Sequence, residues 1–396
     1  MRQKNCDIVI VGAGPAGSLA AKVASENDAQ VILLEEHPEV GEPVYCAEAI
    51  SLNGLIDADV KPEPNIAPQK IDKALVYAPN RSFIELTSDE WAGYTLDRTV
   101  FDNLLAEKAV QAGAELLLST RAVDIVKDKD TVVGVKALQN QQEILINSKI
   151  VIGADGHSSL IRRKAGFKRY FSDYVTCAQY SLTGLNLETP EINEFYIGEK
   201  YAPGGYAWVF PKSSKEANVG LGIRIKHNKP PIEYLDKFLK IDKRFDNSTT
   251  TKLGGGICPV SGMLEKIVDE GVMLAGDSAG QLIPMTGAGI HTAIEAGKIA
   301  GRIAAEAVKE GDVSEKRLSE YPALFNKYWG KRISESRKVV EMLDRFNDDD
   351  LNNLAAILTR DDIISLANGT NVPATLAKLF KRSPLKLMRL MRAYLR

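Results

Sequence analysis

The segment over residues 7–36 constrains the fold more than any other part of this chain. The apolar run Ile8–Val11 has the length of a buried strand and leads directly into Gly-Ala-Gly-Pro-Ala-Gly at residues 12–17. A helical run follows, and a second apolar strand then ends at Glu35. A strand, a glycine-rich turn, a helix and a second strand in this order predict a βαβ unit that binds a dinucleotide.

Each glycine of this fingerprint has an expected role. Gly12 allows the tight turn after the strand, Gly14 lets the backbone approach a pyrophosphate, and Gly17 lets the helix pack closely on the strand. The helix directs its free N–H groups and the positive end of its dipole at the phosphates. Glu35, at the end of the second strand, is placed to accept hydrogen bonds from a ribose.

Composition and length narrow the class of protein. A chain of 396 residues with a formal net charge of −2 suits two packed globular domains, and it contains no apolar stretch long enough to cross a bilayer. Its four cysteines are far apart in the sequence and form no Cys-Xaa-Xaa-Cys pair, which argues against a disulfide scaffold, an iron–sulfur centre or a zinc site. The four histidines show no ligand spacing, so we expect no metal and a cytoplasmic location.

The C-terminal segment carries an uneven charge pattern. Residues 370–396 contain seven basic residues and no acidic one. After Pro384 the basic side chains fall on one helical face and apolar ones on the other, which predicts a basic amphipathic helix over 384–396. Such a helix suits peripheral contact with an anionic membrane surface, and the alternative is a helix docked on the acidic remainder of the chain. We expect no nucleic-acid partner.

The remaining pattern predicts that the chain passes between two domains. We expect a hairpin over 71–87, a helix over 97–112, strands near 114–126, 130–138 and 143–153, alternating strands over 174–226, a long helix ending near 308, and mainly helices over 315–396. The fold class is therefore α/β: a Rossmann-like dinucleotide-binding domain (1–60, 94–165 and 255–310), an inserted antiparallel-sheet, α+β substrate domain (61–93 and 166–254) and a helical C-terminal region (311–396).

Two further strands end in a turn that contains an aspartate. One strand ends in Asp155-Gly156, which is a common turn when taken alone. Another ends in Gly276-Asp277, where an aspartate suits a ribityl hydroxyl. The helix that opens at Gly287-Ala-Gly289 presents free N–H groups to the pyrimidine end of a flavin, which becomes anionic on reduction.

These motifs carry a family resemblance. The glycine fingerprint, the two aspartate turns and Arg98 in Leu-Asp-Arg-Thr-Val-Phe-Asp resemble the glutathione-reductase-like FAD superfamily, in particular its aromatic-hydroxylase-like branch. Residues 43–48 are similar to the Pro-Val-Xaa-Cys-(Gly/Ala)-Glu loop of the geranylgeranyl reductase family, and residues 206–212 match its Tyr-Xaa-Trp-Xaa-Phe-Pro-Lys signature. The chain departs from that pattern at Tyr45, where arginine is frequent, and at Ala49, where glycine is frequent.

The resemblance implies an FAD-dependent reductase that saturates C=C bonds of geranylgeranyl chains, as in archaeal-type membrane phospholipids. It makes the Rossmann-like domain the FAD-binding domain. Carried over by motif, it implies FAD contacts at Ala16, Glu35, Cys46, Ala47, Ala49, Arg98, Ala122, Asp277, Gly289 and Ile290. Because the chain has one dinucleotide fingerprint, which FAD uses, we expect an external electron donor: ferredoxin, a reduced deazaflavin or NAD(P)H.

Reduction of an unconjugated alkene needs a hydride at one carbon and a proton at the other. Cys46 is our first candidate for the acid and Tyr206 the second, while a small packing residue is the alternative for Cys46. Lys212 is predicted to bind a phosphate head group, or else is an exposed lysine at a strand end. Aromatic residues of the predicted sheet are candidates for the wall of a prenyl tunnel, or else ordinary core: Tyr180, Phe195, Tyr196, Trp208 and Phe210.

Other function classes stay open at this point. A flavin-dependent monooxygenase of an aromatic or quinone-like substrate shares the expected fold and consumes oxygen. A flavin dehydrogenase that passes electrons to quinone is disfavoured, because such enzymes often carry an iron–sulfur module that the cysteine spacing excludes. A prenyl-binding escort protein that resembles the Rab GDP-dissociation inhibitors is disfavoured by the intact Asp277 and Gly287-Ala-Gly289 segments.

Overall fold

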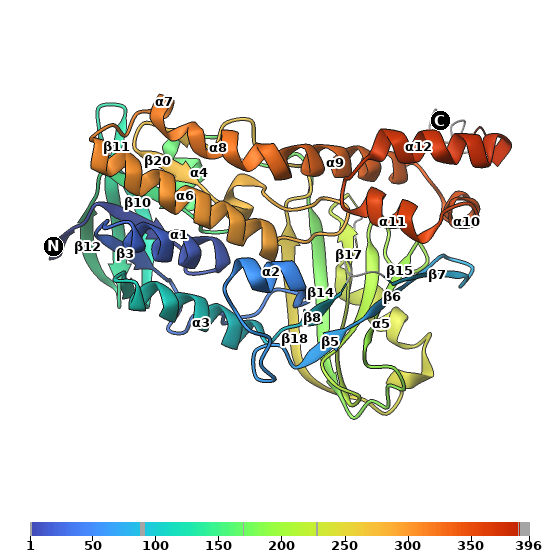
Figure 1. Ribbon diagram of the computed structural model, residues 1–396. Coiled ribbons are helices and arrows are strands. Elements are labelled where there is room, and N and C mark those ends of the chain that lie inside the picture. The colour runs from blue at the N-terminus through green and yellow to red at the C-terminus, as the bar shows by residue number, and fades with distance from the viewer. Residues whose placement is uncertain (1, 88–91, 169, 227–228, 387, 389–396) are drawn as a thin grey trace.

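The computed structural model describes residues 2–386 and 388, apart from residues 88–91, 169 and 227–228 (Figure 1). The basic helix predicted over 384–396 therefore lies mostly outside the described residues, and the preceding helix is α12 (Val372–Arg382). In the described part of the chain no helix is both long enough and apolar enough to cross a membrane.

A six-stranded sheet carries the dinucleotide fingerprint. Its strand order is β19 (Val268–Asp269), β20 (Val272–Leu274), β13 (Ile150–Gly153), β2 (Ile8–Val11), β3 (Val31–Leu34) and β9 (Glu115–Leu117). All neighbours are parallel except β19 and β20. Strands β2, β3 and β13 are buried along their whole length, which explains their continuous apolar runs. In Figure 1, α1 (Pro15–Glu26) packs between α3 (Arg98–Gln111) and α6 (Ile290–Glu310).

A second sheet of four strands corrects two strand predictions. Its order is β1 (Arg2–Asn5), β12 (Gln142–Asn147), β11 (Thr131–Gln139) and β10 (Thr120–Asp128). The predicted strands 114–126 and 143–153 are each two strands, and each pair is divided between two sheets. Ser119, with a φ of 49°, turns the chain between β9 and β10. The first strand of this sheet has no apolar run and was not predicted.

A third sheet has seven strands and forms the right-hand part of Figure 1. Its order is β18 (Thr249–Cys258), β14 (Val175–Thr183), β17 (Glu216–Arg224), β16 (Tyr206–Pro211), β15 (Ile192–Ile197), β6 (Lys73–Tyr77) and β7 (Phe83–Leu86). The predicted hairpin is confirmed as β6 and β7. Because β15 pairs with β6 in parallel, this sheet is mixed rather than purely antiparallel.

Alternate residues of β16 face opposite sides of the seven-stranded sheet. Ala207 and Val209 belong to a buried cluster that includes side chains of α5 (Pro231–Leu239). The opposite face carries the aromatic residues of the sequence motif: Tyr206, Trp208 and Phe210. A small sheet of β4 (Ala49–Ser51), β8 (Gly93–Thr95) and β5 (Gln69–Ile71), together with α2 (Leu52–Asp57), lies in the middle of Figure 1.

Helices make up most of the remaining described structure. They are α4 (Leu160–Ala165), α7 (Glu315–Leu318), α8 (Glu320–Phe325), α9 (Lys331–Leu343), α10 (Asp348–Ala355) and α11 (Arg360–Ala367), with short turns η1 (Lys243–Phe245) and η2 (Gly276–Ala279) and a π-turn η3 (Asn326–Gly330). In Figure 1, α8, α9 and α12 run along the upper edge of the molecule. Arg337 of α9 and Arg224 of β17 both bind the Asp173 carboxylate, so one acid ties this helical region to the sheet.

Candidate active site

The glycine fingerprint has the geometry that a phosphate requires. Gly12 has a φ of 99°, and a Cβ there would lie 2.5 Å from the carbonyl oxygen of Ala154. A Cβ on Gly17 would lie 1.8 Å from the carbonyl oxygen of Gly12, so only glycine permits this contact between helix and turn. By contrast, no atom lies within 4 Å of a Cβ built on Gly14. This open side, at the uncapped N-terminus of α1, fits a pyrophosphate.

The Glu35 carboxylate lies beside the glycine turn. One of its oxygens accepts a hydrogen bond from the N–H of Ala13 at 3.0 Å. The other accepts from the N–H of His37 at 3.0 Å and lies 2.8 Å from Nδ1 of the same residue. These contacts hold the carboxylate at the end of β3, where the sequence predicts a ribose contact. Sequence reasoning did not identify His37 as the group that orients it.

The Asp277 carboxylate belongs to a half-buried residue and accepts no hydrogen bond from the described residues. Burial raises the pKa of this carboxyl to about 6, an effect that the positive charge of Arg98 partly offsets. A Cβ on Gly289 would lie 3.4 Å from Oδ1 of Asp277, so the carboxylate adjoins the N-terminus of α6. A half-buried acceptor that has no donor among the described residues fits a ribityl hydroxyl of FAD.

Asp155, the other aspartate turn, has a structural role. Its Oδ2 accepts a hydrogen bond from the N–H of Ile161 at 3.0 Å, while Ser159 caps α4. Ala122 lies on β10 beside an irregularity in the pairing with β11 and does not line the large cavity described below. Ala16 packs on the Gly276 turn, where a Cβ on Gly276 would lie 3.1 Å from the Ala16 side chain. The FAD contacts assigned to Ala16 and Ala122 stay predictions.

Arg98 and Cys46 are brought together from distant parts of the sequence. The Arg98 guanidinium donates to both carboxylate oxygens of Asp102, at 2.8 and 2.6 Å, and its positive charge acts to lower the pKa of the Cys46 thiol. The sulfur of Cys46 accepts a hydrogen bond from the N–H of Glu48 at 3.2 Å. Burial raises the pKa of Cys46, and the Arg98 charge only partly offsets this effect. The thiol is therefore protonated at neutral pH, as a proton donor must be. Asp102, one helical turn after Arg98, was not identified from the sequence.

Lys212 forms an ion pair and is not the exposed lysine of the alternative interpretation, while its contact with a phosphate head group stays a prediction. Its Nζ lies 2.7 Å from Oε2 of Glu48, a carboxylate that is almost fully buried. The same oxygen accepts from Nδ2 of Asn218 at 2.5 Å, and Oε1 accepts from the N–H of Arg98 at 2.8 Å. Lys212 lines a small separate pocket and not the large cavity. The buried Glu48 carboxylate attracts the ammonium group of Lys212. Sequence reasoning did not identify Glu48 as the partner of Lys212.

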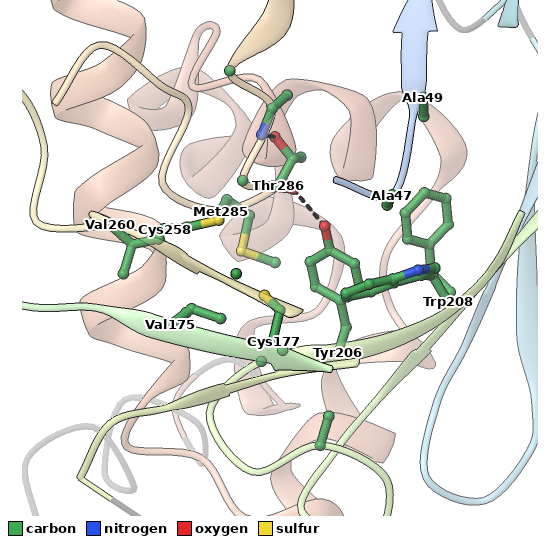
Figure 2. A pocket seen from close by; sticks show the side chains of 18 of the residues that line it. Ala47, Ala49, Val175, Cys177, Tyr206, Trp208, Cys258, Val260, Met285 and Thr286 are labelled. Atoms are coloured by element: carbon green, nitrogen blue, oxygen red, sulfur yellow. Dashed lines mark hydrogen bonds between the residues drawn. The ribbon is translucent and has the colours of Figure 1, made fainter. Parts of the chain in front are cut away.

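A cavity of about 430 Å³ lies between the predicted FAD contacts and the seven-stranded sheet. Part of its wall comes from residues predicted to contact FAD: Cys46, Ala47, Ala49, Gly287, Gly289 and Ile290. Another part comes from the seven-stranded sheet: Phe195, Tyr206, Trp208 and Phe210. Figure 2 shows Tyr206 and Trp208 beside Ala47, with Met285 and Thr286 opposite.

Two predicted wall residues face elsewhere. Tyr180 donates to Asp236 of α5, and Tyr196 stacks on Tyr77, so both belong to the α5 side of the sheet. Strand alternation explains the difference, because Phe195 and Tyr196 are neighbours on β15 and must face opposite sides.

The polar atoms of Tyr206 and Trp208 form hydrogen bonds with other residues of the site. The Tyr206 hydroxyl donates to the carbonyl oxygen of Thr286, as the dashed line in Figure 2 shows, and burial raises its pKa. Nε1 of Trp208 donates to Oε1 of Gln179 at 2.9 Å, and Nε2 of Gln179 donates to the carbonyl oxygen of Cys46 at 2.9 Å. Gln179 was missed, because a single glutamine in a strand has no distinguishing pattern.

Two cysteines that are distant in sequence meet in the cavity wall. Cys177 of β14 and Cys258 of β18 lie on paired strands and both line the large cavity, as Figure 2 shows. All four cysteines are free, as expected. Within the described residues no cluster of three or more histidine, cysteine or acidic side chains is placed to hold a metal ion.

Comparison with known proteins gives consistent matches over the whole chain. Residues 173–258 match the geranylgeranyl reductase catalytic domain, and residues 7–173 match the FAD-dependent oxidoreductases. Digeranylgeranylglycerophospholipid reductase 2 of Methanopyrus kandleri is 38% identical over 96% of each chain. The digeranylgeranylglycerophospholipid reductase of Methanosarcina acetivorans is 41% identical over 88% of this chain and 87% of its own.

Solved structures give the same picture. A geranylgeranyl bacteriochlorophyll reductase-like protein from Thermoplasma acidophilum has a TM-score of 0.89 and 31% identity, over 99% of this chain and 100% of that one. A flavin-dependent brominase has a TM-score of 0.76 at 19% identity, over 97% of this chain and 100% of its own, a likeness that shows the fold alone. The chain thus has the mixed helix-and-sheet fold of FAD-dependent oxidoreductases.

Proposed function

The chain belongs to the geranylgeranyl reductase family, and on that basis we propose that it saturates C=C bonds of geranylgeranyl chains in archaeal-type membrane phospholipids. Its cofactor is FAD, in agreement with the open side of Gly14 and with the Asp277 carboxylate, which has no hydrogen-bond donor among the described residues. The observation that carries the proposal is the single cavity whose wall includes both predicted FAD contacts and the aromatic face of β16.

The cavity suits an isoprenoid chain. Aromatic side chains of the sheet give it an apolar wall, against which a prenyl chain packs and excludes water. FAD, when bound and reduced, supplies the hydride. The residues around it fix the alkene carbons at the distance that transfer requires.

Cys46 is the residue that we propose as proton donor. Cys46 lines the cavity, and burial keeps its thiol protonated. Tyr206 serves a different purpose in this proposal, because its hydroxyl proton is committed to Thr286. We therefore assign Tyr206, Trp208 and Phe210 to substrate contact through their rings.

The finer organisation and the partners also belong to the proposal. We propose the predicted division into a discontinuous FAD-binding domain, an inserted substrate domain and a helical C-terminal region, which agrees with the separate six- and seven-stranded sheets. An external donor (ferredoxin, a reduced deazaflavin or NAD(P)H) reduces the cofactor. A lipid substrate favours peripheral contact with the cytoplasmic membrane face, for which the basic residues 384–396 are suited.

The test is an anaerobic reduction. Dithionite-reduced protein is mixed with a digeranylgeranyl phospholipid in detergent, and the product is read by mass spectrometry while flavin absorbance is followed. We expect a stepwise gain of one dihydrogen unit per double bond, and a loss of that gain in Cys46→Ala. The monooxygenase alternative predicts instead no mass gain without oxygen, and substrate-dependent oxygen consumption in air.

A further inference from the structure

The proposed reaction raises the question of where its protons come from. Each saturated bond consumes one proton, and a single Cys46 thiol supplies one before it must be protonated again. The Tyr206 hydroxyl is not free to do this. When a prenyl chain fills the cavity and excludes water, protons need another route from solvent.

A row of three polar side chains joins the surface to the cavity wall. His291 is the second residue of α6, directly after Ile290, which lines the cavity. Its Nε2 lies 2.6 Å from Oδ2 of Asp57, and its Nδ1 lies 3.4 Å from Oγ of Ser51. Ser51 lines the cavity, whereas the side chain of Asp57 is 37% exposed. The imidazole between them is 22% exposed.

The fold holds this row in place. Ser51 and Asp57 stand at the two ends of α2, where Ser51 is the N-cap and accepts from the N–H of Gly54 at 3.2 Å. A Cβ on Gly54 would lie 3.3 Å from Cβ of His291, so α2 packs closely on the start of α6. The ring of Trp329 contacts the imidazole edge-on, with centroids 5.1 Å apart.

Hydrogen-bond chemistry sets the direction of each contact. An ionised Asp57 carboxylate only accepts, so Nε2 of His291 carries a hydrogen toward it. In the neutral imidazole Nδ1 is then an acceptor, and the Ser51 hydroxyl donates to it. The guanidinium of Arg332 lies over the same Trp329 ring, 5.5 Å from its centroid.

We propose that Asp57, His291 and Ser51 form a proton relay between solvent and the reduction site, an inference that rests on the proposed function. In each cycle the C=C π bond breaks and two C–H bonds form. One hydrogen arrives as hydride with the electron pair of the reduced cofactor, which is oxidised by two electrons. The other arrives as a proton from the cavity, where the Ser51 hydroxyl replaces it and takes in turn the Nδ1 proton of a doubly protonated His291. The imidazole is left neutral with its hydrogen on Nε2, bound to the Asp57 carboxylate, and takes its next proton at Nδ1 from solvent, to which the side chain is 22% exposed.

The relay and the proposed donor adjoin the same cavity. Cys46 packs against the hydrophobic cluster that contains Ile50 and Ile290, the chain neighbours of Ser51 and His291. Cys46 and Ser51 line the same cavity.

The first test is the rate of flavin reoxidation in a single anaerobic turnover, normalised to bound FAD. We expect His291→Ala to lower it about a hundredfold, as loss of proton transfer does. Added imidazole should restore the rate in proportion to its concentration, whereas pyrazole, of equal size but unprotonated near neutral pH, should not. Asp57→Asn and Ser51→Ala should each lower the rate. Asp59→Asn is the matched control, because Asp59 instead pairs with Lys108 at the surface.

A second readout needs no turnover. In ¹⁵N-histidine-labelled protein, the signal absent from His291→Ala should show the tautomer with hydrogen on Nε2, and Asp57→Asn should change that tautomer. The relay is overturned when wild-type protein reduces the lipid and His291→Ala does so equally fast, or when pyrazole rescues as well as imidazole. A wild-type protein that forms no saturated product overturns the proposed function itself.

Discussion

Nζ of Lys212 lies 2.7 Å from Oε2 of Glu48, and this ion pair joins the two most distinctive motifs of the chain. Lys212 ends the Tyr-Xaa-Trp-Xaa-Phe-Pro-Lys segment, and Glu48 ends the Pro-Val-Xaa-Cys-Ala-Glu loop. Trp208 makes a parallel connection, through Gln179, to the carbonyl of Cys46. The polar atoms of the motif on β16 thus hold the loop that bears the cysteine.

Replacing Lys212 with methionine should therefore lower the stability of the protein and its FAD content. The substitution leaves the Glu48 carboxylate buried with only its hydrogen bonds, at a cost of about 3 kcal/mol in the free energy of unfolding. We expect less bound FAD per chain, measured by absorbance, and a lower midpoint in urea. Lys215→Met, at an exposed position on the turn after β16, is the control. Unchanged stability and FAD content with a raised KM for the phospholipid would support the head-group role.

The Gln179 side chain offers a test of how precisely the Cys46 loop is held. Gln179→Leu removes both the bond from Trp208 and the bond to the Cys46 carbonyl. Because small misplacements of a reacting group are costly, we expect kcat to fall about tenfold or more, with FAD retained. Trp208→Phe keeps the bond to Cys46 and should cost less. If kcat falls equally in the two variants, the ring of Trp208 positions the loop, and the hydrogen bonds through Gln179 do not.

Tyr206→Phe separates positioning from acid catalysis. The phenyl ring keeps the packing against Phe195 and Trp208 and loses only the hydrogen bond to the Thr286 carbonyl. We expect kcat to change by less than about tenfold, since removal of a true general acid costs about a hundredfold or more. Anaerobic product formation measures this. A larger fall in kcat, together with loss of the effect of D₂O solvent on the rate, would indicate that Tyr206 is the proton donor.

Much of the site was predictable because local sequence sets it. Gly12 is required by its contact with the backbone of Ala154 and Gly17 by its contact with the backbone of Gly12, while Gly14 leaves open space on the side of the turn where a pyrophosphate fits. The spacing of the three glycines predicts these roles. Asp277 likewise follows a buried strand that ends at the same sheet edge. Predictions of local geometry therefore agree with the structure.

What the sequence left undetermined depends on contacts between distant segments. Lys212 had no visible partner, because Glu48 lies more than a hundred residues earlier in the chain. Tyr196 and Phe195 are both aromatic residues of β15, and only the strand register decides which one reaches the cavity. Likewise, the two strands within 143–153 look like one apolar segment until β1 pairs with the first of them.

Asp277 links the stability of the FAD-free protein to pH. Burial raises the pKa of this carboxyl from 3.8 to about 6 in the folded state. Between those values the folded chain binds more protons than the unfolded chain, so stability falls as pH rises through this window and stays lower above it. The penalty at neutral pH is about 3 kcal/mol.

Asp277→Asn should therefore stabilise the FAD-free protein at neutral pH while weakening FAD binding. The amide carries no charge to desolvate, but it is a poorer acceptor for a ribityl hydroxyl than a carboxylate. Urea unfolding of stripped protein should show the variant more stable above about pH 6, with the difference vanishing near about pH 4. Glu35→Gln, which alters a carboxylate held by hydrogen bonds, should lower FAD affinity without this pH-dependent gain. A stability difference that is the same at both pH values would mean that Asp277 is not the group whose ionisation opposes folding.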